Sequence, residues 1–314
     1  MANLTRLGLF TRTLEHFVAA LSKAFPDRHS SLPEEILKRY GERHGRFSDA
    51  KASEGRRRLE EAAQDLWMLV ERFRDDQPVR MLAEYGLLER LLREQCDLQE
   101  GEPGVALKIP KEIASDSLQS PFDPDATYDG HKGVGYQLQV SKTCAADNPV
   151  QMLTRVEVEQ AHESDQNATI PVLDDLAERN IAPEEFFADT AYNSGDNLLE
   201  AAERGVELMA PTPGQSPDGL DLGYFDLDLK KLRVIACPEG HKPSRNKLGK
   251  DGRTRNLRFD AERCAACPVA QDCPAGRSGG RLRVHPRDIA TAYSRAREET
   301  EEFKQAYAIR AGSE

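Results

Sequence analysis

The sequence predicts an α/β fold for the middle of the chain, and two observations support this. Apolar residues alternate with polar ones at Tyr136, Leu138 and Val140, and again over 153–158, as they do in half-buried strands. Helical and strand-like segments then follow in turn, namely helix 164–180, strand 186–188, helix 194–204 and strand 206–210. Strands that alternate with helices are typical of an α/β domain.

The 314 residues allow about two domains. Apolar residues at helical spacing dominate the first hundred residues, and Pro, Gly, Asp and Ser dominate the next segment. We expect a helical N-terminal region at 1–98, a linker at 99–124, the first part of the α/β core at 125–210, a cysteine-rich basic insertion at 211–286 and a C-terminal helix at 287–314.

The charge of the chain is unevenly distributed. The net charge is −11, which by itself argues against nucleic acid as a partner, since phosphate contacts require Lys and Arg. Residues 237–287, however, contain twelve Lys and Arg against five Asp and Glu. This local excess indicates either a DNA-binding patch or a solvated loop that is rich in arginine.

The sequence shows no segment for export or membrane insertion. There is no run of about 18 apolar residues, and the N-terminus lacks the apolar stretch and cleavage site of a secretory signal. We therefore expect a cytoplasmic protein without membrane contact. In that compartment thiols stay reduced, so the six cysteines suggest metal binding or no special role rather than disulfides.

Three aspartates stand next to predicted strands. Asp123 and Asp125 precede the first strand, and Asp189 follows the short apolar run 186–188. Carboxylates at strand ends can meet at one edge of a sheet and hold Mg²⁺, which prefers oxygen ligands. The alternative is that these residues simply form turns, where Asp is common.

The end of the chain carries a second candidate. Tyr307, Arg310 and Glu314 have the spacing i, i+3 and i+7, which places them on one face of a helix. Gly312 lies within this segment and would bend or end the helix. From the spacing alone, a solvated amphipathic helix is the favoured explanation of the pattern.

Four cysteines are clustered in the basic insertion: Cys237, Cys264, Cys267 and Cys273. Such a set can surround one tetrahedral Zn²⁺, and His241 is a spare candidate ligand. An iron–sulfur cluster and a set of unligated thiols are the alternatives. Cys96 and Cys144 are expected to be plain core residues.

Three separated motifs resemble a known family in the right order. Tyr307-x2-Arg310-x3-Glu314 resembles the Tyr-x2-Arg-x3-Glu-x6-Lys signature of a superfamily of DDE insertion-sequence transposases. Asp189-x2-Tyr192 resembles its second-Asp motif. The segment SLQSPFDPDATYDGHKGVGYQLQV resembles the first-Asp region of its multi-cysteine branch, which carries a cysteine cluster between the second Asp and the Glu. The resemblance runs from about residue 84 to the last residue.

The resemblance implies an RNase H-like mixed sheet flanked by helices. It further implies that Asp123 or Asp125, Asp189 and Glu314 hold two Mg²⁺ ions, with Tyr307 and Arg310 positioning phosphate. Double-stranded DNA, as transposon ends and target, would be the partner of a homo-oligomer that cleaves phosphodiesters and transfers strands. The cysteine-rich insertion would bind one structural zinc ion and contact the DNA backbone.

Two departures from the family pattern leave alternatives open. In relatives of this branch the residue matching Asp125 can be Glu, so Asp123 ranks first as the first acid. The Lys of the signature would fall seven residues after Glu314, so we expect a C-terminally truncated or inactive copy. The alternatives are a non-catalytic zinc-stabilised DNA-binding protein derived from a transposase, and a structure-specific nuclease on the same fold.

Overall fold

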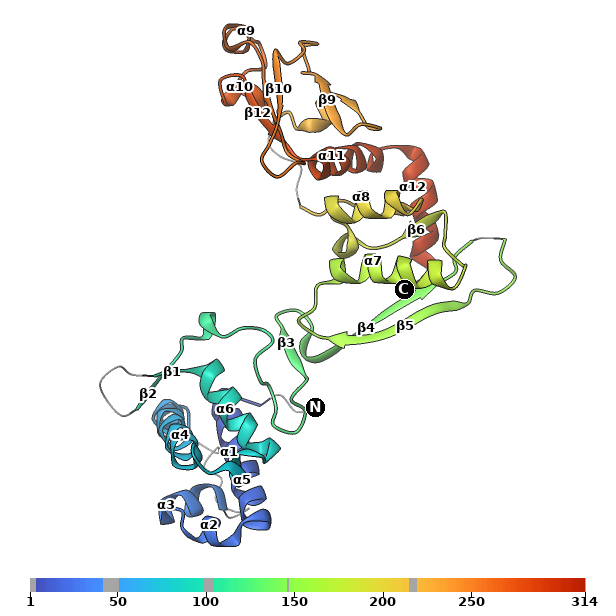
Figure 1. The fold of residues 1–314 in the computed structure, drawn as a ribbon. Coiled ribbons are helices and arrows are strands. Elements are labelled where there is room, and N and C mark those ends of the chain that lie inside the picture. Colours follow the sequence, from blue (N-terminus) through green and yellow to red (C-terminus); the bar gives the residue numbers. More distant parts are fainter. Residues whose placement is uncertain (1–3, 42–50, 99–103, 146, 215–218, 314) are drawn as a thin grey trace. The chain divides into compact units, whose positions relative to one another are not determined.

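The computed structural model describes residues 4–41, 51–98, 104–145, 147–214 and 219–313, which fold as two compact units. Unit 1 comprises Met1–Leu138 with Val158–Glu163, and unit 2 comprises Gln139–Glu157 with Ser164–Glu314. Figure 1 shows that the first unit is mainly helical, whereas the second mixes helices and strands.

Unit 1 is built from helices and short strands. Its α-helices are α1 (Arg6–Ala24), α2 (Pro26–Ser30), α3 (Glu34–Ile36), α4 (Ala52–Phe73), α5 (Gln77–Arg80) and α6 (Ala83–Gln95). A π-helical turn, η1 (Leu37–Gly41), follows α3, and a 3₁₀ turn, η2 (Pro110–Glu112), follows the first strands. These strands are β1 (Cys96–Leu98) and β2 (Val105–Leu107), which pair antiparallel.

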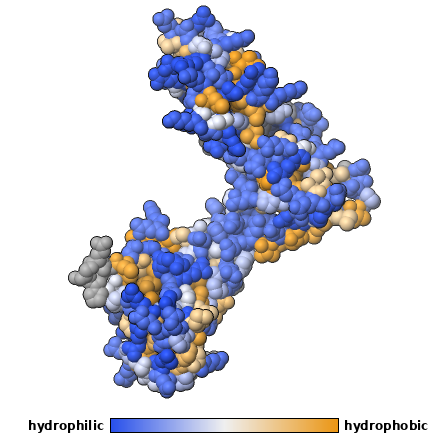
Figure 2. All heavy atoms as spheres, viewed as in Figure 1, coloured by the Kyte–Doolittle hydropathy of each residue, from blue (hydrophilic) through white to orange (hydrophobic). Residues whose placement is uncertain are grey.

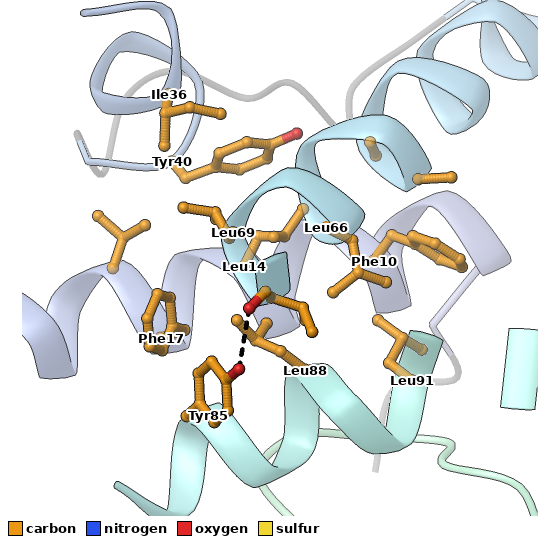
Figure 3. Packing of buried hydrophobic residues seen from close by; sticks show 14 of the residues in the cluster. Phe10, Leu14, Phe17, Ile36, Tyr40, Leu66, Leu69, Tyr85, Leu88 and Leu91 are labelled. Atoms are coloured by element: carbon orange, nitrogen blue, oxygen red, sulfur yellow. Dashed lines mark hydrogen bonds between the residues drawn. The ribbon is translucent and has the colours of Figure 1, made fainter. Parts of the chain in front are cut away.

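The core of unit 1 lies between α1, α4 and α6. Helix α1 begins after Thr5, whose hydroxyl accepts a hydrogen bond from the backbone N–H of Gly8 at 3.0 Å. Its apolar residues recur at helical spacing and are buried against the other two helices (Figure 3). One buried polar group also joins two helices, since the Tyr85 hydroxyl donates to the Val70 carbonyl at 2.9 Å.

A three-stranded sheet of order β3-β4-β5 comes next in the chain. Its strands are β3 (Thr127–Asp129), β4 (Gly133–Lys142) and β5 (Leu153–Gln160). Strands β4 and β5 fall where the alternating pattern predicts strands, but the expectation that their apolar residues are the buried ones is wrong. Leu138 and Val140 are 59% and 51% exposed, whereas Gln139 between them is 4% exposed. Figure 2 shows hydrophobic surface along this hairpin.

Hydrogen bonds explain why the polar face of the hairpin is the inner one. The Gln139 side chain donates to Asp165 at 3.1 Å, and the hydroxyl of Tyr192 also bonds to it. Ser141 and Thr154 form a cross-strand hydroxyl pair at 2.8 Å. Because these polar groups have partners, their burial carries a much smaller desolvation cost.

The α/β part of unit 2 follows the hairpin. It contains the helices α7 (Asp165–Glu178) and α8 (Gly195–Glu203), the 3₁₀ turn η3 (Thr190–Tyr192), and the parallel strands β6 (Glu185–Phe187) and β7 (Glu207–Met209). Apolar residues of α7, α8 and the two strands form one small core. The predicted order of helix, strand, helix and strand is thus present.

The segment rich in cysteine and arginine forms small antiparallel sheets. A 3₁₀ turn, η4 (Leu222–Tyr224), precedes the pair β8 (Asp226–Asp228) and β9 (Arg233–Ala236). A second sheet has the order β10-β11-β12. It consists of β10 (Arg245–Leu248), β11 (Arg255–Arg258) and β12 (Arg281–Val284), with the short helices α9 (Ala261–Ala265) and α10 (Pro274–Arg277) between the last two strands.

The C-terminal segment is divided into α11 (Pro286–Glu298), α12 (Glu301–Tyr307) and the 3₁₀ stretch η5 (Ala308–Ser313). The single long helix that the charge pattern suggests is interrupted because Thr300 caps a new helix. Its hydroxyl accepts from the Phe303 N–H at 3.2 Å.

The structure confirms the α/β class. Within the described residues the strands form five small sheets rather than one mixed sheet, so the RNase H-like architecture stays a prediction. None of the helices in the described ranges is long and apolar enough to cross a membrane.

The helical core of unit 1 gives a test of these packing assignments. Leu88 is completely buried, whereas Leu98 is 68% exposed. We expect Leu88→Ala to lower the free energy of unfolding by about 2–5 kcal/mol, because it leaves a cavity. The exposed control, Leu98→Ala, should change it by less than about 0.5 kcal/mol. Urea denaturation of the full chain measures both values, and equal losses would contradict the assigned core.

Candidate active site

The turn after β6 carries Asp189, the central residue of the site. Asp189 caps η3, since its Oδ1 accepts a hydrogen bond from the Ala191 N–H at 2.6 Å. Strands β6 and β7 are parallel, so this turn lies at the carboxyl edge of the pair, where ligands of α/β sheets bind. Asp189 therefore occupies a turn, as the frequent occurrence of Asp in turns suggested. Its second carboxylate oxygen, Oδ2, does not take part in this cap.

Buried side chains fix the backbone of this turn. The Asn193 side chain, which is fully buried, donates to the carbonyl of Ala210 at 2.8 Å. Asn197 and Thr169 both donate to the carbonyl of Tyr192, at 2.8 and 2.9 Å. Three contacts from three elements thus hold the residues that follow Asp189, which makes the position of its carboxylate well defined.

The C-terminal segment returns to this turn. The Tyr307 hydroxyl donates to the carbonyl of Ala188 at 3.0 Å, and Arg310 Nη1 donates to the Tyr307 hydroxyl at 3.3 Å. Arg310 Nη2 lies 3.5 Å from Asp189 Oδ2. Phe303 stacks on the Tyr307 ring, with centroids 5.4 Å apart. Residues more than a hundred positions apart in the sequence therefore meet here, and Figure 1 shows α12 beside β6.

The docking of α11 on α8 directs α12 to this place. Helix α11 begins at a capping box in which Asp288 accepts from the His285 N–H at 2.8 Å. It packs closely on α8 at Gly195, where an added Cβ would lie 2.6 Å from the carbonyl oxygen of Arg287. Arg287 also contacts Asp196 of α8 at 3.3 Å. Only glycine permits this approach, so Gly195 sets the position of α11.

A small cavity of about 120 Å³ opens beside Asp189. Its polar lining consists of Gln139, Ser141, Arg155, Thr169, Asp189, Tyr192 and Arg310. Sequence reasoning missed Gln139 and Arg155. The signal that could have found them is the polar half of the alternating pattern in β4 and β5, which was assigned to solvent. Both guanidinium groups of the lining already have acidic partners, since Arg155 pairs with Glu157 and with Asp175 at 3.7 Å, and Arg310 lies 3.5 Å from Asp189.

The pair formed by Asp189 and Arg310 contributes little to folding. Their side chains are 45% and 28% exposed, and a solvated ion pair adds only about 0–1 kcal/mol. What stabilises the segment is the packing of α11 and the buried ring of Phe303. Arg310 thus balances the charge of Asp189 without fixing it in place, and the carboxylate can exchange this partner for a metal ion.

Asp123 and Asp125 lie in unit 1, on the loop before β3. Asp123 Oδ1 accepts a hydrogen bond from the Tyr136 hydroxyl at 2.7 Å, and this bond raises the pKa of Tyr136 to about 12. The Asp125 carboxylate is exposed, and its backbone carbonyl accepts from Gln160 at 2.9 Å. The meeting of either aspartate with Asp189, which belongs to unit 2, stays a prediction.

Glu314, the expected third acid, lies outside the described residues. The residues before it do not continue α12. The chain changes at Ala308 from an α-helix to the 3₁₀ stretch η5, although Tyr307 and Arg310 still contact each other as their spacing predicts.

The four clustered cysteines line one cavity of about 430 Å³, together with His241. Cys237 lies on a tight loop closed by hydrogen bonds between its N–H and the His241 carbonyl at 2.9 Å, and between the Gly240 N–H and the Cys237 carbonyl at 2.8 Å. Gly240 has φ of +76°, which suits glycine. Burial, and then the neighbouring thiols, raise the pKa of Cys264.

The thiols converge, but not to coordinating distance. Across the described residues, no group of three or more His, Cys, Asp or Glu is arranged to hold a metal ion. The shared cavity and the four sulfur donors are nevertheless the kind of set that suits Zn²⁺, a borderline-soft cation.

Comparison with known proteins supports the resemblance seen in the sequence. Residues 236–314 match the family model described as "Transposase DDE domain". This part of the chain, which contains the four cysteines, Tyr307 and Arg310, is therefore similar to the DDE domain of transposases. No curated protein and no solved structure matches the chain.

The close approach at Gly195 can be tested. We expect Gly195→Ala to lower the free energy of unfolding of unit 2 by about 1–3 kcal/mol, since α11 must shift to admit the methyl group. Gly86 of α6 has open space around its Cβ position, so Gly86→Ala should instead stabilise by about 0.4–1 kcal/mol. Thermal unfolding of both variants measures these changes. A Gly195→Ala protein with the stability of the wild type would refute the close packing of α11 on α8.

Proposed function

We propose that this protein is a DDE-type transposase that cleaves phosphodiesters at transposon ends and joins the freed strand to target DNA. The observation that carries the proposal is that Arg310 contacts Asp189 while Tyr307, from the same motif as Arg310, bonds to the carbonyl of Ala188 just before it. Asp189 and the pair Tyr307 and Arg310 belong to two separate motifs of the resembling family. The family match at 236–314, which includes Tyr307 and Arg310 but not Asp189, adds support.

The residues divide the chemistry between them. Asp189, either Asp123 or Asp125, and Glu314 would bind two Mg²⁺ ions, and in this arrangement Asp189 exchanges its contact with Arg310 for a metal. When bound, the ions supply an activated water or 3′-hydroxyl and stabilise the leaving oxygen. Arg310 then grips a phosphate oxygen, and the hydrogen bond to the Ala188 carbonyl holds Tyr307 beside it.

The surroundings of Asp189 fit this role. Its turn is held by buried amides, so the carboxylate needs little reorganisation to accept a cation. In the adjoining cavity, Arg310 would suit the phosphate of a substrate once it leaves its contact with Asp189. An RNase H-like arrangement of the core would bring the remaining acids to the same edge.

Zinc is proposed as the structural ion of the cysteine-rich segment. Cys237, Cys264, Cys267 and Cys273 would bind one Zn²⁺ after moving inward into their shared cavity. Such a site would add to the small hydrophobic core of this segment, against which Cys237 and Cys264 pack. The DNA partner would be double-stranded, and the active form a homo-oligomer on DNA.

The carboxylate at position 189 gives the direct test of catalysis. We expect Asp189→Asn to abolish Mg²⁺-dependent nicking of a duplex carrying the transposon end, because the neutral amide is a poor ligand for Mg²⁺. DNA binding, measured by gel shift, should remain. The matched control Asp226→Asn, at an exposed position on β8, should leave nicking unchanged.

The same nicking assay shows whether Asp123 or Asp125 is the first catalytic acid. Asp123→Asn should remove nicking and Asp125→Asn should reduce it less. Nicking by the Asp189→Asn protein at the wild-type rate would reject the assignment of the site. A wild-type protein that binds DNA but never cuts it would favour the non-catalytic alternative, and cutting without joining would favour the nuclease.

Native mass spectrometry tests the zinc proposal. We expect one Zn²⁺ per chain, and removal by a chelator should lower the midpoint of thermal unfolding because metal binding stabilises only the folded state. Cys264→Ser should lose the ion. Cys144→Ser, which alters a cysteine outside the cluster, should keep it. A folded wild-type protein without bound metal would show that the four thiols are unligated.

A further inference from the structure

The sheet β10-β11-β12 has two chemically different faces. Leu257 and Val284 point to the core and are each 3% exposed. The residues that alternate with them are exposed and form two rows across the strands. One row is Arg245, Arg258 and Arg281, and the other is Lys247, Asn256 and Arg283. We call the face made of these six residues the cationic face.

Among the described residues, acids compensate only one of the five cations of the cationic face. Its residues, with Leu257, Ser278 and Leu282, line a shallow groove of about 400 Å³, and this lining contains no Asp or Glu. Among the described residues, Arg283 is the only cation of the face with an acidic partner within ion-pair distance, namely Asp251 at 3.9 Å. Like charges placed opposite each other on neighbouring strands destabilise a sheet. The fold therefore gives no reason for this arrangement, whereas an anionic ligand does.

The dimensions of the face indicate a polymer rather than a single phosphate. Three strands are about 10 Å wide, and two rows along a strand are about 7 Å apart. Five cations spread over this area can contact several phosphates at once. Duplex DNA presents one negative charge per about 1.7 Å of its axis, so several phosphates fall within the face.

We infer that the cationic face is a binding surface for the phosphate backbone of duplex DNA, separate from the cavity at Asp189. The choice of DNA as the polyanion rests on the proposed function. The existence of an anion-binding surface rests on the register of β10, β11 and β12, which gathers the cations on one face. Arg and Lys side chains at two-residue spacing contact backbone phosphates without reading bases, so binding is independent of sequence and weakens with salt.

Binding of a fluorescein-labelled duplex of about 25 base pairs with arbitrary sequence tests this inference. Anisotropy is measured on the full chain without added divalent metal, from about 50 to 200 mM salt. The variant Arg245→Glu/Lys247→Glu should bind at least about tenfold more weakly at low salt. Its slope of log affinity against log salt should be smaller by about 2, because each lost phosphate contact removes about 0.9.

The control Lys230→Glu/Lys231→Glu changes the net charge equally on the exposed turn between β8 and β9, and should leave the slope unchanged. Arg281→Gln/Arg283→Gln, which alters another strand of the face, must also lower the affinity. Equal losses for the face and control variants, or no loss for either face variant, would overturn the inference. Stronger competition by single-stranded RNA than by duplex DNA would overturn the choice of DNA.

The outcome is separable from that of the catalytic proposal. Asp189→Asn should retain the wild-type affinity and slope, because it lies outside the face. If the face variants lose DNA binding while Asp189→Asn still nicks DNA, the surface stands and the catalytic assignment fails. If the face variants bind DNA as the wild type does while Asp189→Asn abolishes nicking, the catalytic assignment stands and the binding surface fails.

Discussion

The return of the C-terminal helices to the turn after β6 is the constraint on which the candidate site depends. The contact of α11 with α8, together with the buried ring of Phe303, holds Tyr307 on the Ala188 carbonyl and Arg310 beside Asp189. That contact needs glycine at position 195, where any side chain would meet the backbone of α11. The need for glycine at one position of α8 thus determines whether the motif that begins at Tyr307 can reach the motif at Asp189.

The sequence singled out three residues that the structure brings together, although their role as an active site stays a prediction. Spacing and motif resemblance singled out Asp189, Tyr307 and Arg310, and the structure brings these three together. Periodicity also located β4 and β5, because alternation is a local property of an extended chain. It assigned the wrong face to the core, since which face is buried depends on partners distant in sequence. Gln139 is buried because Asp165 and Tyr192 form hydrogen bonds with it, and these partners cannot be identified from the alternating pattern alone.

Other features lay beyond sequence reasoning for similar reasons. The break at Thr300 follows from a local cap within a helical pattern, and the spacing of apolar residues carries no signal for such a cap. The basic excess of residues 237–287 was visible as a count of charges. Its concentration on one face of β10-β11-β12 follows from strand register, which joins Arg245, Arg258 and Arg281 into a row across three strands.

The two surfaces have complementary tasks. The cationic face would hold DNA by charge over several phosphates, with an affinity set by salt. The pocket at Asp189 would act on one phosphodiester, where geometry and a divalent cation matter more than charge alone. An acidic chain with a net charge of −11 can still bind DNA in this way, because the cations are concentrated in one place.

The most direct test of the account is the location of the metal. A crystal of the protein with a transposon-end duplex and Mn²⁺ in place of Mg²⁺ would show the ions by anomalous scattering. The account predicts a peak at coordination distance from Asp189 Oδ2, with a second carboxylate from Asp123 or Asp125 on the same ion and Arg310 turned to a phosphate. A peak elsewhere, with Asp189 still held by Arg310, would contradict it.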